Sequence, residues 1–237
     1  EYPHQSALHF MGKEMTYLEV YESALKLANE LRKLGLQKEE RVAIMLPNTP
    51  QSVISYYAVL LAGGTVVQTN PLYTERELEH QLKDADVKIL ICVDLVHPRV
   101  MRVKDETSLE HIIVTSIKDY LPFPKNLLYP LVRKRDYPDL KLNIQYNETM
   151  HRFTDLIKRG EAKEIPLEID PKKDVALLQY TGGTTGLAKG VILTHYNLTV
   201  NTQQCKAWNY KIKDGEESVL AILPFFHVYG MTVVMNL

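Results

Sequence analysis

The sequence predicts an α/β fold in which layered, mostly parallel β-sheets are flanked by helices. Short apolar runs alternate with longer amphipathic segments along much of the chain, a pattern typical of parallel strands connected by helices. The apolar runs, such as "RVAIML" (41–46) and "KILICV" (88–93), show no regular polar alternation, which indicates strands covered on both faces. The sequence contains no internal repeat and no low-complexity tract.

The first helix is predicted from Thr16, in "TYLEVYESALKLANELRKLG" (16–35). Thr16 and Glu19 have the spacing of a capping box, in which each side chain caps the backbone of the other residue. Gly35 suits the C-terminal end, where a left-handed backbone is common. The apolar residues at helical spacing, which we expect to face the core, are Leu18, Tyr21, Leu25, Ala28 and Leu31.

The next segments continue the alternation up to residue 115. Thr74 and Glu77 repeat the capping-box spacing, and Pro47 ends the first apolar run. Tyr56 and Tyr57 lie among apolar residues at helical spacing and are interpreted as packing residues. The predicted strands are 41–46, 65–68, 88–93 and 111–115, and the predicted helices are about 50–62, 74–85 and 95–105.

Residues 118–166 interrupt the alternation. The stretch "DYLPFPKNLLYPLVRKRDYPDLK" (119–141) contains four prolines and the basic cluster Arg133, Lys134 and Arg135. One interpretation is a surface element that touches a membrane or anionic lipid. The simpler interpretation, which the sequence favours, is an excursion packed by its own aromatic residues, with the basic cluster solvated.

Regular structure is predicted again from Asp174. Strands are expected at "VALLQY" (175–180) and "VILT" (191–194), on either side of a glycine-rich loop. Thr194 or Asn197 can cap a helix that runs to about Trp208. A further strand is expected at "SVLAILP" (218–224), and "FFHVYGM" (225–231) leads into a helix.

The composition indicates a soluble globular protein. The chain has 237 residues, with 45% hydrophobic and 24% charged residues, enough for one large domain or two small ones. A net charge of -1 gives no general attraction to nucleic acid or anionic membranes. Two cysteines indicate a reducing compartment, and no signal peptide or convincing membrane span is present, so we expect a cytoplasmic protein. The termini at Glu1 and Leu237 suggest a piece of a longer protein, truncated at both ends.

The loop "QYTGGTTGLAKGV" (179–191) carries the clearest chemical signal. It holds four glycines, three threonines and one lysine. Glycines let backbone N–H groups approach a ligand and form an anion-binding concavity, while hydroxyls and Lys189 add donors and positive charge. These groups together suit a polyphosphate. The spacing differs from the P-loop and from the dinucleotide fingerprint, and a glycine-rich hairpin turn is the bland alternative.

At these residues the chain resembles the adenylate-forming superfamily, which includes acyl-CoA synthetases, luciferases and peptide-synthetase adenylation domains. "YTGGTTGLAKGV" is similar to its phosphate-binding signature, except that Ala188 stands where the family usually has proline. "LTHYNL" (193–198) and "LPFFHVYG" (223–230) resemble its next motifs. The stretches at 62–82 and 121–130 resemble bacterial long-chain fatty acid–CoA ligases in particular.

The resemblance implies an incomplete N-terminal part of the adenylate-forming fold, a partial AMP-binding domain over 1–237. It implies a fatty acid, ATP and coenzyme A as substrates, with Mg²⁺, and a two-step reaction through acyl-AMP and pyrophosphate. Lys189 and His227 are the implied catalytic residues, and Thr184 is the implied magnesium ligand. The implied phosphate-binding residues, within the loop 181–190, are Thr181, Gly182, Gly183, Thr184, Thr185, Gly186, Lys189 and Gly190. The implied acyl-pocket residues are His227, Val228, Tyr229, Gly230 and Met231.

Several alternatives remain open at this point. The family's later motifs, including a magnesium-binding glutamate and a C-terminal catalytic lysine, do not occur in the chain, so this piece alone is expected to be inactive. Another acid–CoA ligase for aryl or medium-chain acids, a non-catalytic nucleotide- or lipid-binding module, and an unrelated phosphoryl-transfer enzyme also fit parts of the sequence. No nucleic-acid partner is expected; a homodimer and peripheral contact with the inner face of a membrane are compatible with the sequence. His195 is expected to fix the strand-to-helix turn after the loop.

Overall fold

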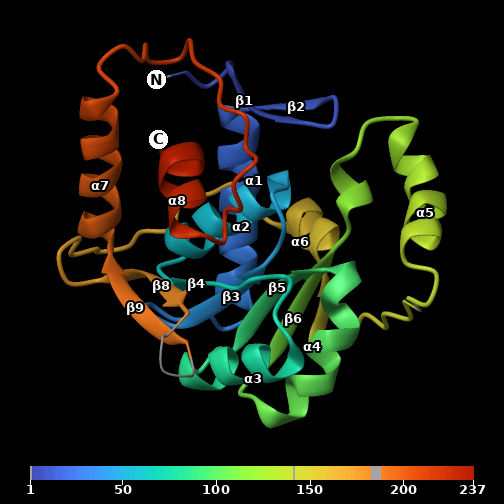
Figure 1. Cartoon of the computed structure of the whole chain (residues 1–237). Coiled ribbons are helices and arrows are strands. Elements are labelled where there is room, and N and C mark those ends of the chain that lie inside the picture. Colours follow the sequence, from blue (N-terminus) through green and yellow to red (C-terminus); the bar gives the residue numbers. More distant parts are fainter. Residues whose placement is uncertain (1, 141, 183–187) are drawn as a thin grey trace.

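The computed structural model describes residues 2–140, 142–182 and 188–237. Its centre is a seven-stranded sheet with the strand order β7-β6-β5-β3-β4-β8-β9 (Figure 1). All neighbouring strands in this sheet are parallel except β8 and β9, which are antiparallel. The predicted α/β fold with a mostly parallel sheet is therefore confirmed.

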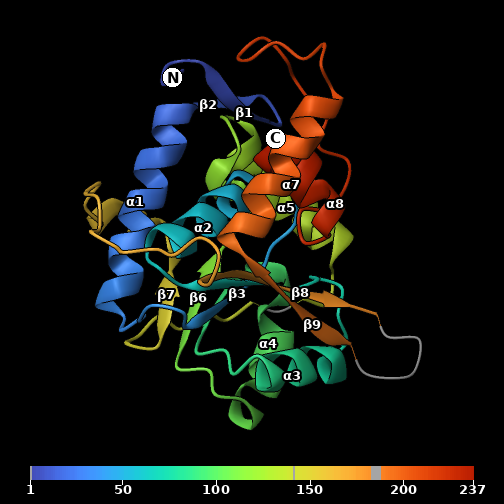
Figure 2. The ribbon, with the colours of Figure 1, turned by 90° about the vertical axis from the view of Figure 1, so that its left-hand side faces the viewer.

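Helices cover both faces of this sheet. In Figures 1 and 2, α1 and α2 lie on one face, and α3 and α4 lie on the other. A separate antiparallel hairpin precedes the sheet, formed by β1 (Ser6–Phe10) and β2 (Lys13–Thr16). The strands of the central sheet are β3 (Arg41–Met45), β4 (Thr65–Gln68), β5 (Ile89–Val93), β6 (His111–Thr115), β7 (Met150–Arg152), β8 (Val175–Thr181) and β9 (Lys189–Thr194). The α-helices are α1 (Tyr17–Lys33), α2 (Pro50–Leu61), α3 (Glu75–Asp84), α4 (His97–Val103), α5 (Lys125–Asp136), α6 (Phe153–Arg159), α7 (His195–Trp208) and the short α8 (Val228–Gly230).

Local capping signals place the helix starts as predicted. Thr16 and Thr74 both form complete capping boxes, with Glu19 and Glu77 respectively. Thr194, rather than Asn197, is the N-cap of α7, and the Asn197 side chain completes that box. These caps satisfy backbone N–H groups that would otherwise have no partner in the helix.

The buried face of α1 differs from the predicted one. Leu18 and Tyr21 are 37% and 41% exposed, so this part of the prediction is wrong. The face against the sheet is rotated toward Val20 and Ala24, and the residues of α1 that are buried are Val20, Ala24, Leu25, Leu27, Ala28, Glu30 and Leu31. Two apolar stripes are present on this helix, and only tertiary packing decides which of them is buried.

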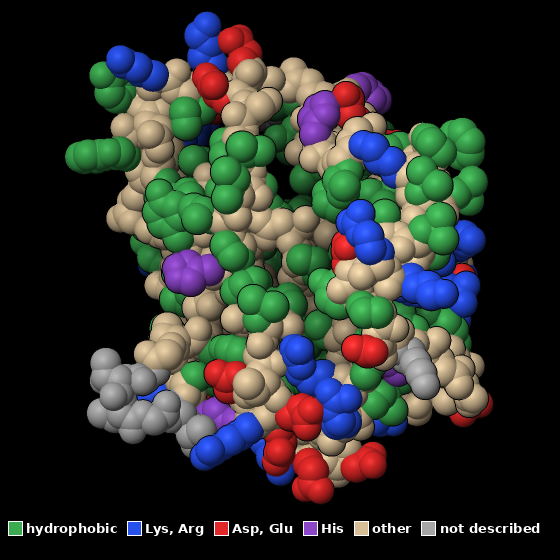
Figure 3. Space-filling model, turned by 45° about the vertical axis from the view of Figure 1, so that its right-hand side comes forward, with side chains coloured by type: hydrophobic (Ala, Val, Ile, Leu, Met, Phe, Trp, Pro, Cys, Tyr) green, Lys and Arg blue, Asp and Glu red, His purple; other side chains and the backbone are tan. Residues whose placement is uncertain are grey.

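The segment 118–166 departs from the alternation for only part of its length. Met150–Arg152 forms β7 and extends the sheet beside β6, and α6 follows it and packs against α1. Between β6 and β7 lies α5, in which no residue is fully buried. Figure 3 shows the side of the molecule that carries this helix, with hydrophobic side chains on its surface. The interpretation of an excursion packed by its own aromatic residues therefore does not describe α5.

The predicted strand at 218–224 is wrong. These residues form no strand in the described part of the chain, and Val219, Leu220 and Ile222 are 59%, 80% and 75% exposed. An apolar run becomes a strand only where a neighbouring strand accepts its backbone hydrogen bonds. Here the Asn48 side chain holds the segment instead, by hydrogen bonds to its backbone.

Candidate functional site

The glycine-rich loop connects two antiparallel strands at one edge of the central sheet. At its base, Thr181 pairs with Lys189, and Tyr180 pairs with Gly190 in the β8–β9 ladder. The side chains of Thr181 and Lys189 are exposed, and Gly182 is exposed beside them. The hairpin therefore presents a hydroxyl and an ammonium group side by side. The sequence-predicted residues that lie outside the described part of the chain are Gly183, Thr184, Thr185 and Gly186.

Helix α3 supports the base of this hairpin. The Tyr180 hydroxyl donates a hydrogen bond to Asp84 Oδ2 at 2.5 Å, and His80 Nε2 lies 3.0 Å from the carbonyl oxygen of Ala188. Burial raises the pKa of Tyr180 above its ordinary value, and the contact with Asp84 raises it further. Tyr180 therefore stays a neutral donor that ties the sheet to α3.

Gly190 leaves room for the Tyr180 ring. A Cβ atom at residue 190 would lie 3.1 Å from Cζ of Tyr180, closer than ordinary van der Waals contact. The ring cannot easily retreat, because its hydroxyl is bound to Asp84. The glycine that follows the lysine therefore has a packing role at the hairpin base, in addition to the phosphate-binding role implied by the sequence.

A second predicted group, residues 227–231, lies on a turn that two amide side chains hold against the sheet. Gln179 of β8 donates from Nε2 to the carbonyl oxygen of Phe226 at 3.1 Å. Asn48, which follows β3, donates from Nδ2 to the carbonyl oxygens of Ala221 and Leu223 at 3.0 and 2.8 Å. The Asn48 Oδ1 atom also accepts the N–H of Phe225 at 2.8 Å.

His227 begins the short helix α8. Its Nδ1 atom accepts a hydrogen bond from the N–H of Tyr229 at 3.3 Å, so the neutral ring carries its proton on Nε2. His227 and Tyr229 are exposed, and Val228 is 38% exposed. The side chain of His227 is thus a surface donor, with one nitrogen engaged in a helix cap and the other directed away from that bond.

The last two predicted acyl-pocket residues are buried. A Cβ atom at Gly230 would lie 2.4 Å from the carbonyl oxygen of Pro224, so only glycine fits there. Met231 is fully buried within the hydrophobic core. Tyr57 of α2 contacts the π-helical segment Met231–Asn236 that follows α8, where its hydroxyl donates to Asn236 Oδ1 at 3.2 Å. Tyr56 and Tyr57 form an edge-to-face pair with 5.2 Å between ring centroids, and the packing role predicted for them is confirmed.

Both groups lie at the carboxyl edge of the sheet. Asn48 follows β3, and Gln179 and Thr181 lie near the end of the parallel strand β8. Ligands of open α/β sheets bind at this edge, where strand ends and loops meet. The structure therefore brings the loop base and the His227 turn to the edge at which a ligand would be expected, with Gln179 connecting the two.

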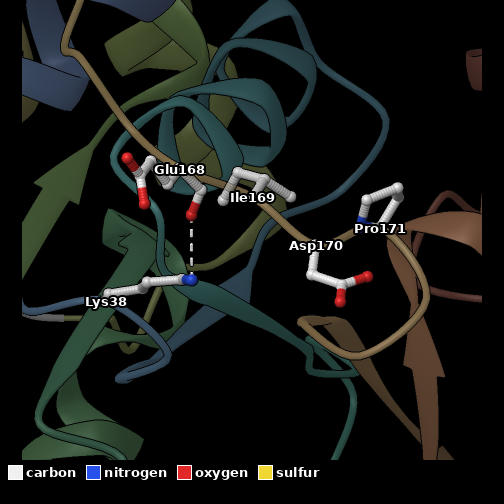
Figure 4. A pocket seen from close by; sticks show the side chains of 5 residues that line it. All are labelled: Lys38, Glu168, Ile169, Asp170 and Pro171. Atoms are coloured by element: carbon white, nitrogen blue, oxygen red, sulfur yellow. Dashed lines mark hydrogen bonds between the residues drawn. The ribbon is translucent and has the colours of Figure 1, made fainter.

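A surface depression lies at the opposite, amino-terminal edge. It is lined by Lys38, Glu168, Ile169, Asp170 and Pro171 (Figure 4). These residues precede β3 and β8, whereas the loop base lies at the end of β8. Lys38 Nζ donates to the Glu168 carbonyl oxygen at 2.9 Å and forms an ion pair with Asp174 at 2.7 Å. Its charge is thus already neutralised, and the depression has no link to the loop.

Other sequence expectations concern the turn after the loop and metal sites. The N–H of His195 donates to the carbonyl oxygen of Asp174 at 3.3 Å, at the strand-to-helix turn where a structural role was expected. Burial lowers the pKa of His195, and the nearby Asp174 opposes this shift.

Within residues 2–140, 142–182 and 188–237, no group of three or more His, Cys, Asp or Glu side chains is placed to hold a metal ion. In the same residues, no helix is long and apolar enough to cross a bilayer.

Comparison with known proteins identifies the family. The model of the AMP-binding enzyme family matches residues 1–237. This chain belongs to that family. It is 52% identical over 238 residues to a long-chain-fatty-acid–CoA ligase of Bacillus subtilis (strain 168), covering 99% of this chain and 42% of that protein. It is 38% identical to the corresponding ligase of Yersinia pestis, covering 98% of this chain and 41% of that protein.

A solved structure supports the fold of this AMP-binding chain. The crystal structure of a long-chain-fatty-acid–CoA ligase from Archaeoglobus fulgidus matches with a TM-score of 0.77 at 24% identity, covering 100% of this chain and 42% of that one. The chain thus spans 42% of the length of both this structure and the Bacillus subtilis relative.

Sequence reasoning missed the residues that position the two groups in this AMP-binding chain. Asn48, Asp84 and Gln179 each act on a segment that is far away in the sequence. Asn48 and Leu223, for example, are 175 positions apart. The one local sign was an asparagine directly after a buried strand and a proline, which is a common turn position.

Proposed function

We propose that this chain is the ATP-handling part of an AMP-forming long-chain fatty acid–CoA ligase. The single observation that carries the proposal is that the loop base and the His227 turn meet at the carboxyl edge of one sheet. At the loop base, Thr181 and Lys189 are paired across the hairpin. The relatives named above supply the reaction class and the long-chain acid. In the proposed reaction, a fatty carboxylate attacks the α-phosphate of ATP, pyrophosphate leaves, and the coenzyme A thiol then displaces AMP to form the thioester.

The loop base suits the first of these steps. A carboxylate and a triphosphate are both anionic, so their approach requires positive charge and aimed donors. Lys189 is an exposed point charge on a strand end, and Thr181 offers a hydroxyl opposite it. We assign residues 181–190 to the β- and γ-phosphates, and Lys189 to the charge that develops on the departing pyrophosphate.

His227 is proposed to lie beside the acyl carboxylate and the α-phosphate. Its helix cap fixes Nδ1 as an acceptor, which leaves Nε2–H to donate to an oxygen atom. Val228 and Tyr229 are exposed next to it and suit the mouth of an acyl pocket. Gly230 and Met231 are buried, so we assign them to support of the pocket wall.

Mg²⁺ is proposed as the companion of ATP, with Thr184 as a ligand. Among the described residues, no group of three or more His, Cys, Asp or Glu side chains is placed to hold the ion by itself, which is consistent with Mg²⁺ arriving bound to the phosphates of ATP. We also propose that the enzyme is cytoplasmic. Residues 1–237 are proposed to be part of one AMP-binding domain, with an excursion at 118–166. A homodimer is a further proposal.

Product analysis tests the proposal. The gene product that contains this sequence would be incubated with ATP, Mg²⁺, coenzyme A and palmitate. Lys189→Ala would be tested beside the control Lys211→Ala, which removes an exposed lysine just beyond the end of α7. We expect AMP, pyrophosphate and palmitoyl-CoA, with kcat/KM reduced roughly 100- to 1,000-fold by Lys189→Ala and unchanged in the control. ADP as product, or turnover without palmitate, would overturn the reaction. Preference for an aryl acid would overturn the substrate class alone.

A further inference from the structure

Helix α5 stands on the surface with an apolar face turned away from the protein. Three residues spaced along one side of it, Asn126, Tyr129 and Arg133, are partly buried, while their neighbours are exposed. This spacing of three and four residues defines the side that faces the body of the protein. The opposite side has no protein element against it in the described structure, as the right-hand side of Figure 1 shows.

The inward side is attached by specific contacts. Arg133 Nη1 forms an ion pair with the buried Asp94 Oδ2 at 3.4 Å. Lys125 Nζ donates to the carbonyl oxygen of Met11 at 2.6 Å, which ties the start of the helix to the β1–β2 hairpin. Tyr129 is partly buried on the same side, and this burial raises the pKa of its hydroxyl to about 12. Helix α5 is thus oriented by its polar side, and its orientation leaves the leucines outward.

The outward side is apolar over its first two turns. Leu127, Leu128 and Leu131 are 66%, 52% and 67% exposed, and Val132 is 42% exposed. Phe123, just before the helix, is 78% exposed. In a globular protein, large side chains gathered in this way indicate a contact surface rather than scattered exposure.

Positive charge borders this apolar side. The helix sequence KNLLYPLVRKRD contains four basic residues and one acidic residue. Of the basic residues, Lys125 and Arg133 are engaged on the inward side, and Arg135 is paired with Asp136. Lys134 is exposed on the last turn next to Leu131. Figure 3 shows Lys and Arg side chains beside the hydrophobic ones on this side of the molecule. A short helix with one apolar face, bordered by Lys and Arg, is typical of helices that lie in a lipid interface.

We propose that α5 docks the protein onto an anionic lipid bilayer, with the leucines in the headgroup–acyl boundary and Lys134 against the lipid phosphates. The helix has 12 residues, too few to span a bilayer, so it lies on the surface. The basic border favours a negatively charged surface over a second copy of this side, because two such faces would repel each other. This inference does not depend on the reaction proposed above.

Vesicle sedimentation tests this docking. The gene product that contains this sequence would be mixed with vesicles of phosphatidylcholine alone, or of phosphatidylcholine with phosphatidylglycerol. We expect binding to the mixed vesicles that weakens at high salt, and little binding to the neutral ones. The double variant Leu127→Ser/Leu131→Ser should reduce the partition coefficient at least about tenfold, and Lys134→Glu should reduce it by at least about fivefold.

Matched controls are available elsewhere on the surface. Leu72→Ser removes a leucine that is 81% exposed in the turn between β4 and α3, and Lys211→Glu reverses a charge near the end of α7. Both controls should bind as the unmodified chain does, and circular dichroism should show all variants folded. Equal binding to neutral vesicles, no binding to either, or equal loss in the controls would overturn the proposal. A concentration-dependent dimer that the leucine double variant dissociates would also overturn it, by assigning the face to a second copy.

Discussion

Asn48 is expected to control the position of the His227 turn. Its side chain makes three hydrogen bonds to the backbone of residues 221–225, a segment that has no sheet partner in the described structure. Asn48→Ala removes all three bonds without changing any residue of the turn itself. The prediction is that the turn opens locally while the rest of the sheet stays folded, since β3 and β8 are paired independently of this side chain.

The magnitude follows from the exposure of each bond. The two bonds to Ala221 and Leu223 are exposed, so water replaces them at little cost, whereas the bond to the Phe225 N–H is partly buried. A net hydrogen bond contributes about 0.5–1.5 kcal/mol, and the lower end applies to the two exposed ones. The loss is therefore about 2 kcal/mol, which corresponds to a roughly 30-fold increase in local opening.

Amide hydrogen exchange measures this opening. Phe225 is the residue to follow, because its N–H is bound directly to Asn48, and we expect its protection to fall roughly 30-fold in Asn48→Ala. Asn147→Ala is the matched control, since the Asn147 side chain also makes three hydrogen bonds, in the loop before β7. Unchanged protection of Phe225 in Asn48→Ala, or equal loss in Asn147→Ala, would refute the reasoning.

Two further predictions concern stability. Gly190→Ala should cost about 1–3 kcal/mol because the new methyl group meets the fixed ring of Tyr180; urea denaturation checks this, and a neutral result would mean that the ring can move. Glu30 is buried and paired with Lys33 and Arg159. Burial alone would raise the pKa of Glu30. The hydrogen bonds from Lys33 and Arg159 outweigh this effect and lower the pKa below the ordinary 4.5. The stability that Glu30 contributes is therefore present above pH 4.5 and is lost as the pH falls through the lower folded value. Urea midpoints of the unmodified chain and of Glu30→Gln should converge at acid pH, and a constant difference would contradict the assignment.

Features that depend on neighbouring residues could be predicted from the sequence. The capping boxes at Thr16 and Thr74 need only residues three positions apart, and the structure confirms both. The apolar runs "RVAIML" and "KILICV" become central strands, where β3 and β5 are neighbours and fully covered. The residue types alone decided these elements, because the same runs would be costly anywhere except in a covered sheet.

Features that depend on distant partners could not be predicted in this way. The run "SVLAILP" has the composition of a strand but lacks a neighbouring strand in the described structure. The opposite holds for β7, whose three residues carry little strand signal and gain their place by pairing with β6. On α5, the sequence could not decide whether the leucines pack inward; the ion pair between Arg133 and Asp94 decides it, by turning the polar side of the helix to the body.

The loop base could be predicted from its amino-acid composition, but the residues that hold it in place could not be predicted. Glycines, threonines and one lysine indicate an anion site wherever they occur together. That Tyr180 reaches Asp84 across 96 positions is a consequence of β8 lying next to β4, which only the folded sheet establishes.

The supports of the His227 turn are uncharged, and this bears on how the proposed site would bind a polyphosphate. The His227 turn is held by the amide side chains of Asn48 and Gln179, while the hairpin base is held by the hydrogen bond from the Tyr180 hydroxyl to the carboxyl group of Asp84. A carboxylate in place of Asn48 would still accept the Phe225 N–H, but it would repel both the carbonyl oxygens of residues 221 and 223 and an approaching phosphate. A lysine there would donate to the carbonyl oxygens but would compete with Lys189 for the ligand. Amides fix the turn without adding a charge beside it, so the turn neither competes with Lys189 for the ligand nor repels an approaching phosphate.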